Sequence, residues 1–110
     1  MRIEGERGLT GQLVIRVDGE VLAPERSLAL WNHSPDGFEC GYAGSGPAQL
    51  ALAILLAAGV EEARAVRLHQ RFKFAHVQHW QTPFDVSIDV FDWIARSTGD
   101  TDARDLGADR

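Results

Sequence analysis

The strongest constraint on the fold of this chain is a glycine-rich loop, residues 37–46, that leads directly into an apolar segment, residues 47–58. The apolar segment consists of strong helix formers and is apolar on nearly all sides. Pro47 suits the first turn of a helix, and Ser45 or Gly46 suits the N-cap before it. The sequence therefore predicts a central buried helix whose N-terminal amides lie at the loop.

The glycine loop has two interpretations. Amides at a helix N-terminus can hold a phosphate or a carboxylate, whereas glycines also permit close packing alone. Gly41 and Gly46 have the spacing of a nucleotide-binding P-loop, but Pro47 and Ala48 stand where Lys and Ser or Thr are needed. No nucleophile elbow and no dinucleotide-binding fingerprint occur in the sequence. We expect anion recognition by backbone amides without catalysis, with loop packing as the alternative.

The first third of the sequence indicates β-strands. Residues 12–17 are rich in β-branched side chains, and the Asp18-Gly19 dipeptide predicts a tight turn that returns the chain along residues 20–23. Residues 3–6 and 27–31 are further candidate strands. The fold class predicted is α+β, with a small N-terminal antiparallel sheet of three or four strands packed against the central helix and two further helices.

Two further helices are expected after the central helix. One begins at Val60 or Glu61 and reaches at least Phe72; we expect it to continue through Trp80, with extended chain after Lys73 as the alternative. The other follows a short extended piece at residues 84–86, has Ser87 as its N-cap, and runs to about Arg96.

Length and charge limit the class of protein. The chain has 110 residues, which suits one domain, residues 1–97, followed by an acidic tail, residues 98–110. No apolar run reaches the ~20 residues of a membrane span, the single cysteine Cys40 cannot form a disulfide within the chain, and a cytoplasmic location is expected. The net charge of −5 argues against non-specific nucleic-acid binding.

Candidate ligand-binding residues gather at the glycine loop. The predicted set is His33, Tyr42, Gly44, Ser45, Gly46 and Arg71. His33 precedes the loop, Tyr42 could stack on a ring, and Arg71 belongs to a basic stripe with Arg64 and Arg67 whose alternative role is a solvated helix face.

No catalytic or metal-binding set is expected. Two histidines three residues apart, His76 and His79, lack further ligands in the sequence, so no metal site and no cofactor are predicted. Cys40 could act as a nucleophile only beside a base, and a small buried thiol is the expected state.

The run from Asn32 to Leu55 also resembles a known family. The segment Asn32-His33-Ser34-Pro35-Asp36-Gly37-Phe38-Glu39, followed by Gly41-Tyr42 and by Gly44-Ser45-Gly46-Pro47-Ala48-Gln49-Leu50, is similar to the signature of domain-of-unknown-function family 6166. The resemblance extends through Gln70-Arg71-Phe72-Lys73 and Trp93, and it differs at Cys40, where Trp is usual, and at Ala43, where Gly is usual. The resemblance implies a cytoplasmic protein of bacteria, archaea, phages or other mobile elements, and brings no activity.

The function expected from the sequence is non-enzymatic. A small protein, phage or mobile-element encoded, would hold or sequester an anionic, nucleotide-like ligand at the glycine loop, and a homo-oligomer is compatible with this role. The alternative is an interaction module or inhibitor of counter-defence type that binds a host protein through acidic side chains. The acidic residues concerned are Asp85, Asp89, Asp92, Asp100, Asp102, Asp105 and Asp109.

Overall fold

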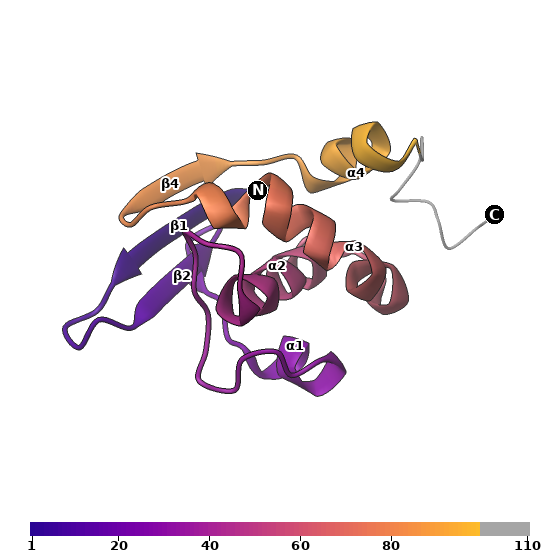
Figure 1. Ribbon diagram of the computed structural model, residues 1–110. Helices are drawn as coiled ribbons and strands as arrows, with labels where there is room; N and C mark the ends of the chain where they lie inside the picture. Colours follow the sequence, from indigo (N-terminus) through magenta and orange to yellow (C-terminus); the bar gives the residue numbers. More distant parts are fainter. Residues whose placement is uncertain (100–110) are drawn as a thin grey trace.

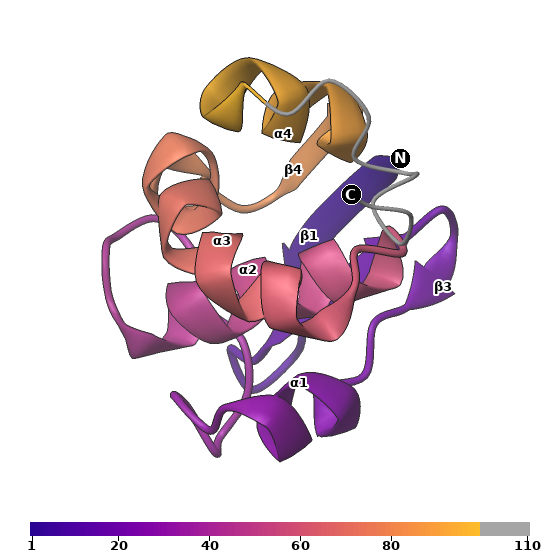
Figure 2. The same cartoon turned by 90° about the vertical axis from the view of Figure 1, so that its right-hand side faces the viewer.

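A buried helix lies at the centre of the computed structural model, which describes residues 1–99 (Figure 1). Figures 1 and 2 both place this helix, α2, between a four-stranded sheet and helix α3. The strands are β1 (Arg2–Arg7), β2 (Leu13–Val17), β3 (Glu20–Val21) and β4 (Phe84–Ser87). The helices are α1 (Glu25–Leu30), α2 (Ser45–Ala57), α3 (Glu62–Ala75), the 3-10 turn η1 (Val77–His79) and α4 (Val90–Thr98). The predicted α+β fold is confirmed.

The sheet is antiparallel, with the strand order β3-β2-β1-β4. The predicted hairpin is confirmed, because Asp18 (φ 50°) and Gly19 (φ 89°) form the turn that joins β2 to β3. Strand β4 comes from the C-terminal part of the chain and pairs with β1, so the fourth strand is not local in sequence. Ile3 on β1 and Ile15 on β2 are fully buried on the face that packs against α2.

Helix α2 is buried along almost its whole length. Every residue from Gly46 to Leu56 is buried, which explains why the segment is apolar on all sides. The N-cap is Gly44, one residue earlier than predicted, and Pro47 lies in the first turn as expected. Gly59 ends the segment with a positive φ of 96°, a conformation that favours glycine.

One predicted strand is wrong. Residues 27–31 lie in and directly after α1, and no strand forms there. The Ser27 hydroxyl donates to the Pro24 carbonyl oxygen at 2.9 Å and accepts a hydrogen bond from Gln49 Nε2 at 2.9 Å. The contact with Gln49 joins this turn to α2, so tertiary contacts outweigh the weak local preference for a strand.

The boundaries of α3 and α4 also differ from the prediction. Helix α3 does not continue through Trp80: it ends at Ala75, and after His76 the chain forms the single turn η1. The Gly41 amide donates to the Val77 carbonyl at 3.1 Å, so the glycine loop takes up a carbonyl group of this turn. Ser87 is part of β4 rather than a cap, and the α4 cap is Asp89.

The acidic tail predicted at residues 98–110 lies largely outside the described residues. Thr98 is the last residue of α4, and Gly99 follows in the left-handed conformation at φ 81°. Within residues 1–99, no helix has both the length and the apolar character needed to cross a membrane.

The position of the α4 cap gives a first prediction. The Asp89 carboxylate accepts the Asp92 amide at 3.0 Å, so Asp89→Ala should lower the free energy of unfolding by about 1 kcal/mol in urea denaturation. Ser87→Ala is the matched control, since Ser87 is exposed, and should change that free energy by less than ~0.5 kcal/mol. Equal losses in the two variants would contradict the assignment of the cap.

Candidate functional site

Steric contacts account for three of the four glycines of the loop, whereas an added Cβ at Gly37 would meet nothing within 4 Å. At Gly41, φ is 88° and an added Cβ would lie 3.0 Å from the Trp80 carbonyl oxygen. A Cβ at Gly44 would lie 2.5 Å from the Tyr42 ring, and one at Gly46 would lie 2.5 Å from Glu39 Cβ. The structure therefore gives these three glycines a packing role, whether or not an anion binds the amides.

The arginine beside the loop is Arg7, not Arg71. Arg7 donates two hydrogen bonds to the Glu39 carboxylate, at 2.9 and 2.8 Å, and Glu39 packs against Gly46 at the start of α2. The guanidinium lowers the pKa of Glu39 and the carboxylate raises the pKa of Arg7. A carboxylate of the protein thus lies next to the helix N-terminus, where a bound anion was expected.

The predicted ligand residues do not form one group. Tyr42, half exposed at 51%, lies over Gly44, and Ser45 is exposed beside it. Arg71 points to a different element, because its guanidinium donates to the Ser97 carbonyl of α4 at 3.1 Å. His33 contacts α3 and α2 rather than the glycines.

A second set of residues, here named the histidine cluster, consists of Trp31, His33, His69 and Lys73. The Nε2 atoms of His33 and His69 are 2.8 Å apart. The Trp31 ring stacks on His33, with centroids 5.1 Å apart and planes at 10°, and lies tilted against His69 at 5.8 Å. Trp31 is half exposed at 50%, so the cluster opens to solvent at its indole ring.

Gln49 of α2 holds His33 in place. Its side chain is fully buried, and its Oε1 accepts the His33 amide at 2.7 Å and the Ser34 amide at 3.1 Å. Gln49 Nε2 in turn donates to Ser27 of α1. The buried amide therefore connects α1, α2 and the segment that carries Trp31 and His33.

The hydrogen bonds assign the tautomers of the two imidazoles. His69 Nδ1 contacts the Val66 carbonyl, which can only accept, so this nitrogen carries the proton. In the neutral ring His69 Nε2 is then an acceptor, and His33 Nε2 must be the donor between the rings. Nδ1 of His33 is the one remaining nitrogen, and it has no hydrogen-bond partner among the described residues.

Lys73 supplies the positive charge of the cluster. Only 7% of its surface is exposed, and its ammonium lies 4.2 Å from the centroid of the Phe74 ring. Within residues 1–99 no carboxylate lies within ion-pair distance of it. Lys73 Nζ is not among the buried polar atoms that lack a hydrogen-bond partner, so the ammonium at the end of this buried side chain reaches solvent. A solvent-accessible ammonium without a carboxylate partner among the described residues can bind an external anion.

Burial and Lys73 keep the two imidazoles neutral. Burial lowers the pKa of His33, and the neighbouring His69 and the positive charge of Lys73 lower it further. Burial also lowers the pKa of His69, partly offset by hydrogen bonds to the backbone of Val66 and Ala65. The unliganded cluster therefore carries the charge of Lys73 alone at neutral pH.

A metal ion does not fit between the two imidazoles. Two nitrogens bound to one tetrahedral zinc, each at about 2.0–2.1 Å, stand roughly 3.4 Å apart, and the observed 2.8 Å is a hydrogen-bond distance. In the part of the chain that the structure describes, no group of three or more His, Cys, Asp or Glu side chains could hold a metal ion.

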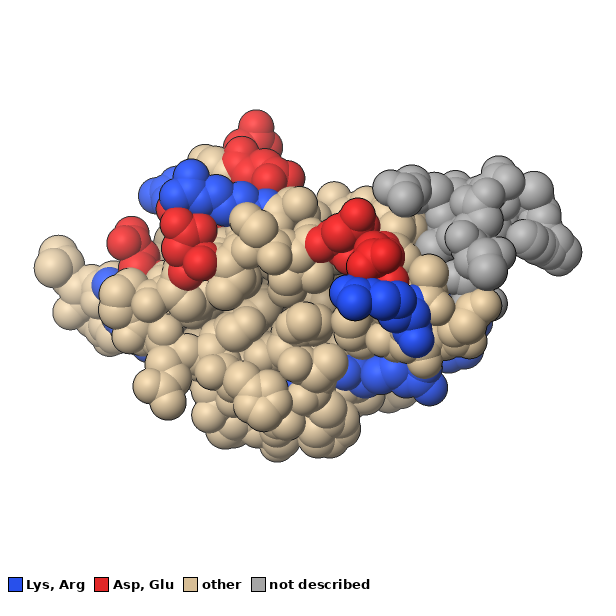
Figure 3. Space-filling model, turned by 90° about the horizontal axis from the view of Figure 1, so that it is seen from above, with Lys and Arg blue, Asp and Glu red and all other residues tan. Residues whose placement is uncertain are grey.

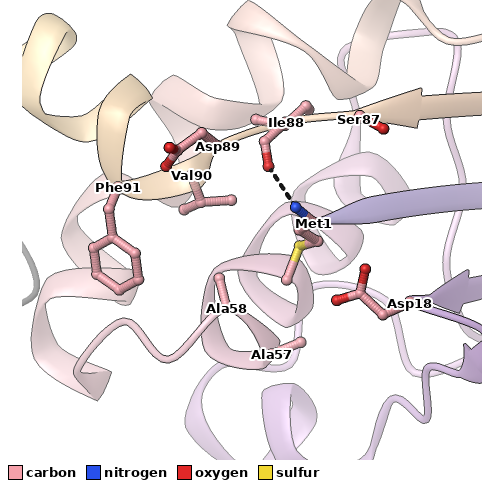
Figure 4. A pocket seen from close by; sticks show the side chains of 9 residues that line it. All are labelled: Met1, Asp18, Ala57, Ala58, Ser87, Ile88, Asp89, Val90 and Phe91. Atoms are coloured by element: carbon pink, nitrogen blue, oxygen red, sulfur yellow. Dashed lines mark hydrogen bonds between the residues drawn. The ribbon is translucent and has the colours of Figure 1, made fainter.

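Three cavities lie away from the histidine cluster, with volumes of about 560, 340 and 220 Å³. The largest is shown in Figure 4 and lies between the start of β1, the end of α2 and the segment before α4. Three of its polar groups have partners within the chain. The Met1 amine donates to the Ile88 carbonyl at 3.1 Å, Asp18 accepts the Arg2 amide, and Asp89 caps α4. This cavity is therefore a less suitable ligand site than the histidine cluster.

The described acidic residues of the alternative interaction surface are also engaged. Asp85 accepts two hydrogen bonds from Arg2, at 3.0 and 2.7 Å, and Asp92 pairs with Arg96 at 3.0 Å. On the face shown in Figure 3 acidic side chains lie beside basic ones. The other four aspartates of that surface, from Asp100 onward, lie outside the described residues.

The fold and this cluster define a small α+β protein with a half-exposed aromatic and cationic site. The chain belongs to the Family of unknown function (DUF6166), whose model matches residues 3–97. The family predicted from the glycine-loop signature is thus confirmed. No curated protein and no solved structure was found to match the chain.

Sequence reasoning missed His69 and Lys73. Both lie on α3 four residues apart, so they share a helix face, and this spacing was the available signal. On the same helix, the basic stripe of Arg64, Arg67 and Arg71 is the more conspicuous pattern in the sequence.

Steric crowding at Gly46 gives a second prediction. Gly46→Ala should lower the free energy of unfolding by about 1–3 kcal/mol, because the new Cβ meets Glu39 Cβ and the Glu39 backbone nitrogen. Alanine is otherwise favoured over glycine in a helix by roughly 1 kcal/mol. The adjacent exposed Ser45→Ala is the control; a stabilised Gly46→Ala variant would show that the glycine has no packing role.

The histidine pair gives a third prediction, on pH. Since the pKa values of His33 and His69 are lowered in the folded state, the unfolded chain binds more protons below its histidine pKa of about 6.5. The free energy of unfolding should be at its maximum above about pH 7 and should decrease on acidification towards about pH 5. Each unit of lowering contributes ~1.4 kcal/mol.

Denaturation of His69→Gln across the same pH range checks this. The variant should lose less stability on acidification than the wild type, whatever its stability at neutral pH. His79→Gln, which changes an exposed histidine, should keep most of the wild-type loss, because His79 only adds to the lowering of the His76 pKa that burial causes. An unchanged pH dependence in His69→Gln would refute the contribution of the pair.

Proposed function

We propose that this protein is a non-enzymatic binding protein that holds an anionic, nucleotide-like ligand at the histidine cluster. The observation that carries the proposal is the Lys73 ammonium, which lacks a carboxylate partner among the described residues and lies one helical turn after His69, whose ring contacts the half-exposed Trp31. An ammonium and an indole face together suit a ligand that has both a negative charge and a flat ring.

The proposal moves the ligand away from the amides of the glycine loop. Glu39 adds negative charge at the start of α2, and three of the loop glycines have packing roles, so the amides alone are a poorer anion site than Lys73. The loop then acts indirectly, because it starts the helix whose Gln49 holds His33.

A binding role without catalysis agrees with the residues of the cluster. Its four side chains include no Ser, Cys, Asp or Glu that could serve as nucleophile, and both imidazoles already bond to each other. We include in the proposal that such a protein sequesters a small signal molecule, as a phage or mobile element would use against a host defence. Sequestration requires only tight binding at a concentration comparable to that of the ligand.

The fourth prediction tests this function by isothermal titration calorimetry and thermal shift. The probes are the nucleoside 5′-monophosphates, cyclic nucleotides, sugar phosphates and inorganic phosphate. Binding of a nucleotide is expected, and Lys73→Met should weaken it by roughly tenfold or more through loss of the ionic contact. Trp31→Ala should weaken it about 5- to 100-fold, which corresponds to the ~1–3 kcal/mol of base stacking.

Arg67→Met is the matched control. It removes one positive charge from the exposed face of the same helix, and affinity should change by less than about twofold. Circular dichroism and thermal unfolding check that each variant is folded. If no probe binds the wild type, or if Lys73→Met and Arg67→Met bind equally well, the proposal fails.

A further inference from the structure

One nitrogen of the His33–His69 pair, which has no hydrogen-bond partner among the described residues, bears on the charge of the ligand. Of the four imidazole nitrogens of His33 and His69, three are engaged: two in the bond between the rings and one at the Val66 carbonyl. Nδ1 of His33 remains, and it is not among the buried side-chain atoms that lack a hydrogen-bond partner; since no partner for it is found among the described residues, it is not fully buried. The pair can therefore accept one proton there without losing a hydrogen bond, whereas a second proton would break the bond between the rings.

We infer, on the basis of the function proposed above, that the ligand presents a phosphate monoester dianion and that its binding places one proton on the pair, at Nδ1 of His33. The proton comes from solvent, and no covalent bond forms or breaks in the ligand. Nδ1–H then donates to the phosphate beside Lys73.

Charge matching favours a dianion. Lys73 supplies one positive charge and the protonated pair supplies a second, so a phosphate monoester with a charge near −2 is neutralised. A carboxylate would be neutralised by Lys73 alone and would gain less from a second cation. Because these groups are partly buried, the local dielectric constant is lower than in water, and an unbalanced charge costs more free energy.

The groups around His33 explain why its Nδ1 becomes protonated only when the ligand binds. The titratable and charged groups that act on it are His69 and Lys73, both from α3, and they oppose a positive charge. From α2 the neutral Gln49 contacts its backbone, and from its own segment the Trp31 ring covers one face. A bound dianion would reverse the net field at Nδ1, because it outweighs Lys73.

The fifth prediction concerns proton uptake on binding. Titrations of the full chain with a nucleoside 5′-monophosphate near pH 7.5 are run in buffers of different ionisation enthalpy. The slope of the observed enthalpy against the buffer enthalpy counts protons, and it should approach one per ligand. The phosphate itself cannot supply this signal, since its second pKa is about 6 and a cationic site would lower it further.

Because proton uptake and ligand binding are coupled, the affinity should also depend on pH. If the free pair is neutral and the bound pair carries one proton, the dissociation constant should rise by up to about tenfold per pH unit above neutral pH. A nucleoside 5′-sulfate, which is a monoanion at these pH values, should bind more weakly and take up fewer protons.

Two variants separate this inference from the proposed function. His33→Gln should retain weakened nucleotide binding but lose proton uptake, whereas His79→Gln, at an exposed histidine, should retain both. Nitrogen-15 NMR of the wild type should show His33 protonated on both nitrogens in the complex, with His69 still carrying its Nδ1 proton.

The outcomes are distinct. Absence of nucleotide binding would overturn the proposed function together with this inference. Binding with a proton count near zero, or with undiminished uptake in His33→Gln, would overturn this inference and leave the proposed function standing. A proton count near one that His33→Gln abolishes would support it.

Discussion

The buried side chain of Gln49 is the interaction on which the arrangement of the candidate site depends. It sits on the apolar helix α2 with no exposed surface, and its amide group joins Ser27 of α1 to the backbone of His33 and Ser34. A buried amide without these partners would be strongly unfavourable, so the partners are held in one geometry. This geometry places His33 within hydrogen-bond distance of His69 on α3.

The glycine loop contributes to the site through packing. Gly46 allows the Glu39 main chain to pass close to the first turn of α2, and Gly41 lets its own amide bond to the Val77 carbonyl after α3. The loop thereby fixes the start of α2 and the end of α3 together. Because Gln49 lies on the first of these helices and Lys73 near the end of the second, the loop sets the spacing of the groups that we propose bind the ligand.

The electrostatic character of the histidine cluster follows from the absence of a carboxylate beside Lys73 within residues 1–99. Arg2, Arg7 and Arg96 each bond to a carboxylate on the surface, whereas the Lys73 ammonium lies over the half-exposed Phe74 ring and has no carboxylate partner within residues 1–99. Exposed ion pairs are screened by solvent and contribute little to binding. The charge of Lys73 is not offset by a carboxylate among the described residues, which makes it the stronger determinant of ligand charge.

The sequence by itself determined the features that depend on local chemistry. The continuous run of apolar helix formers and Gly59 defined α2, Asp18-Gly19 defined the β2–β3 hairpin, and the glycine-loop signature identified the family. Tertiary structure decided what depends on distant partners. Residues 27–30 are helical beside Gln49, β4 pairs with β1, and His33 bonds to His69 across 36 positions of sequence. Local propensity carries no information on such pairings, because their free energy comes from burial and hydrogen bonds that exist only once the chain has folded.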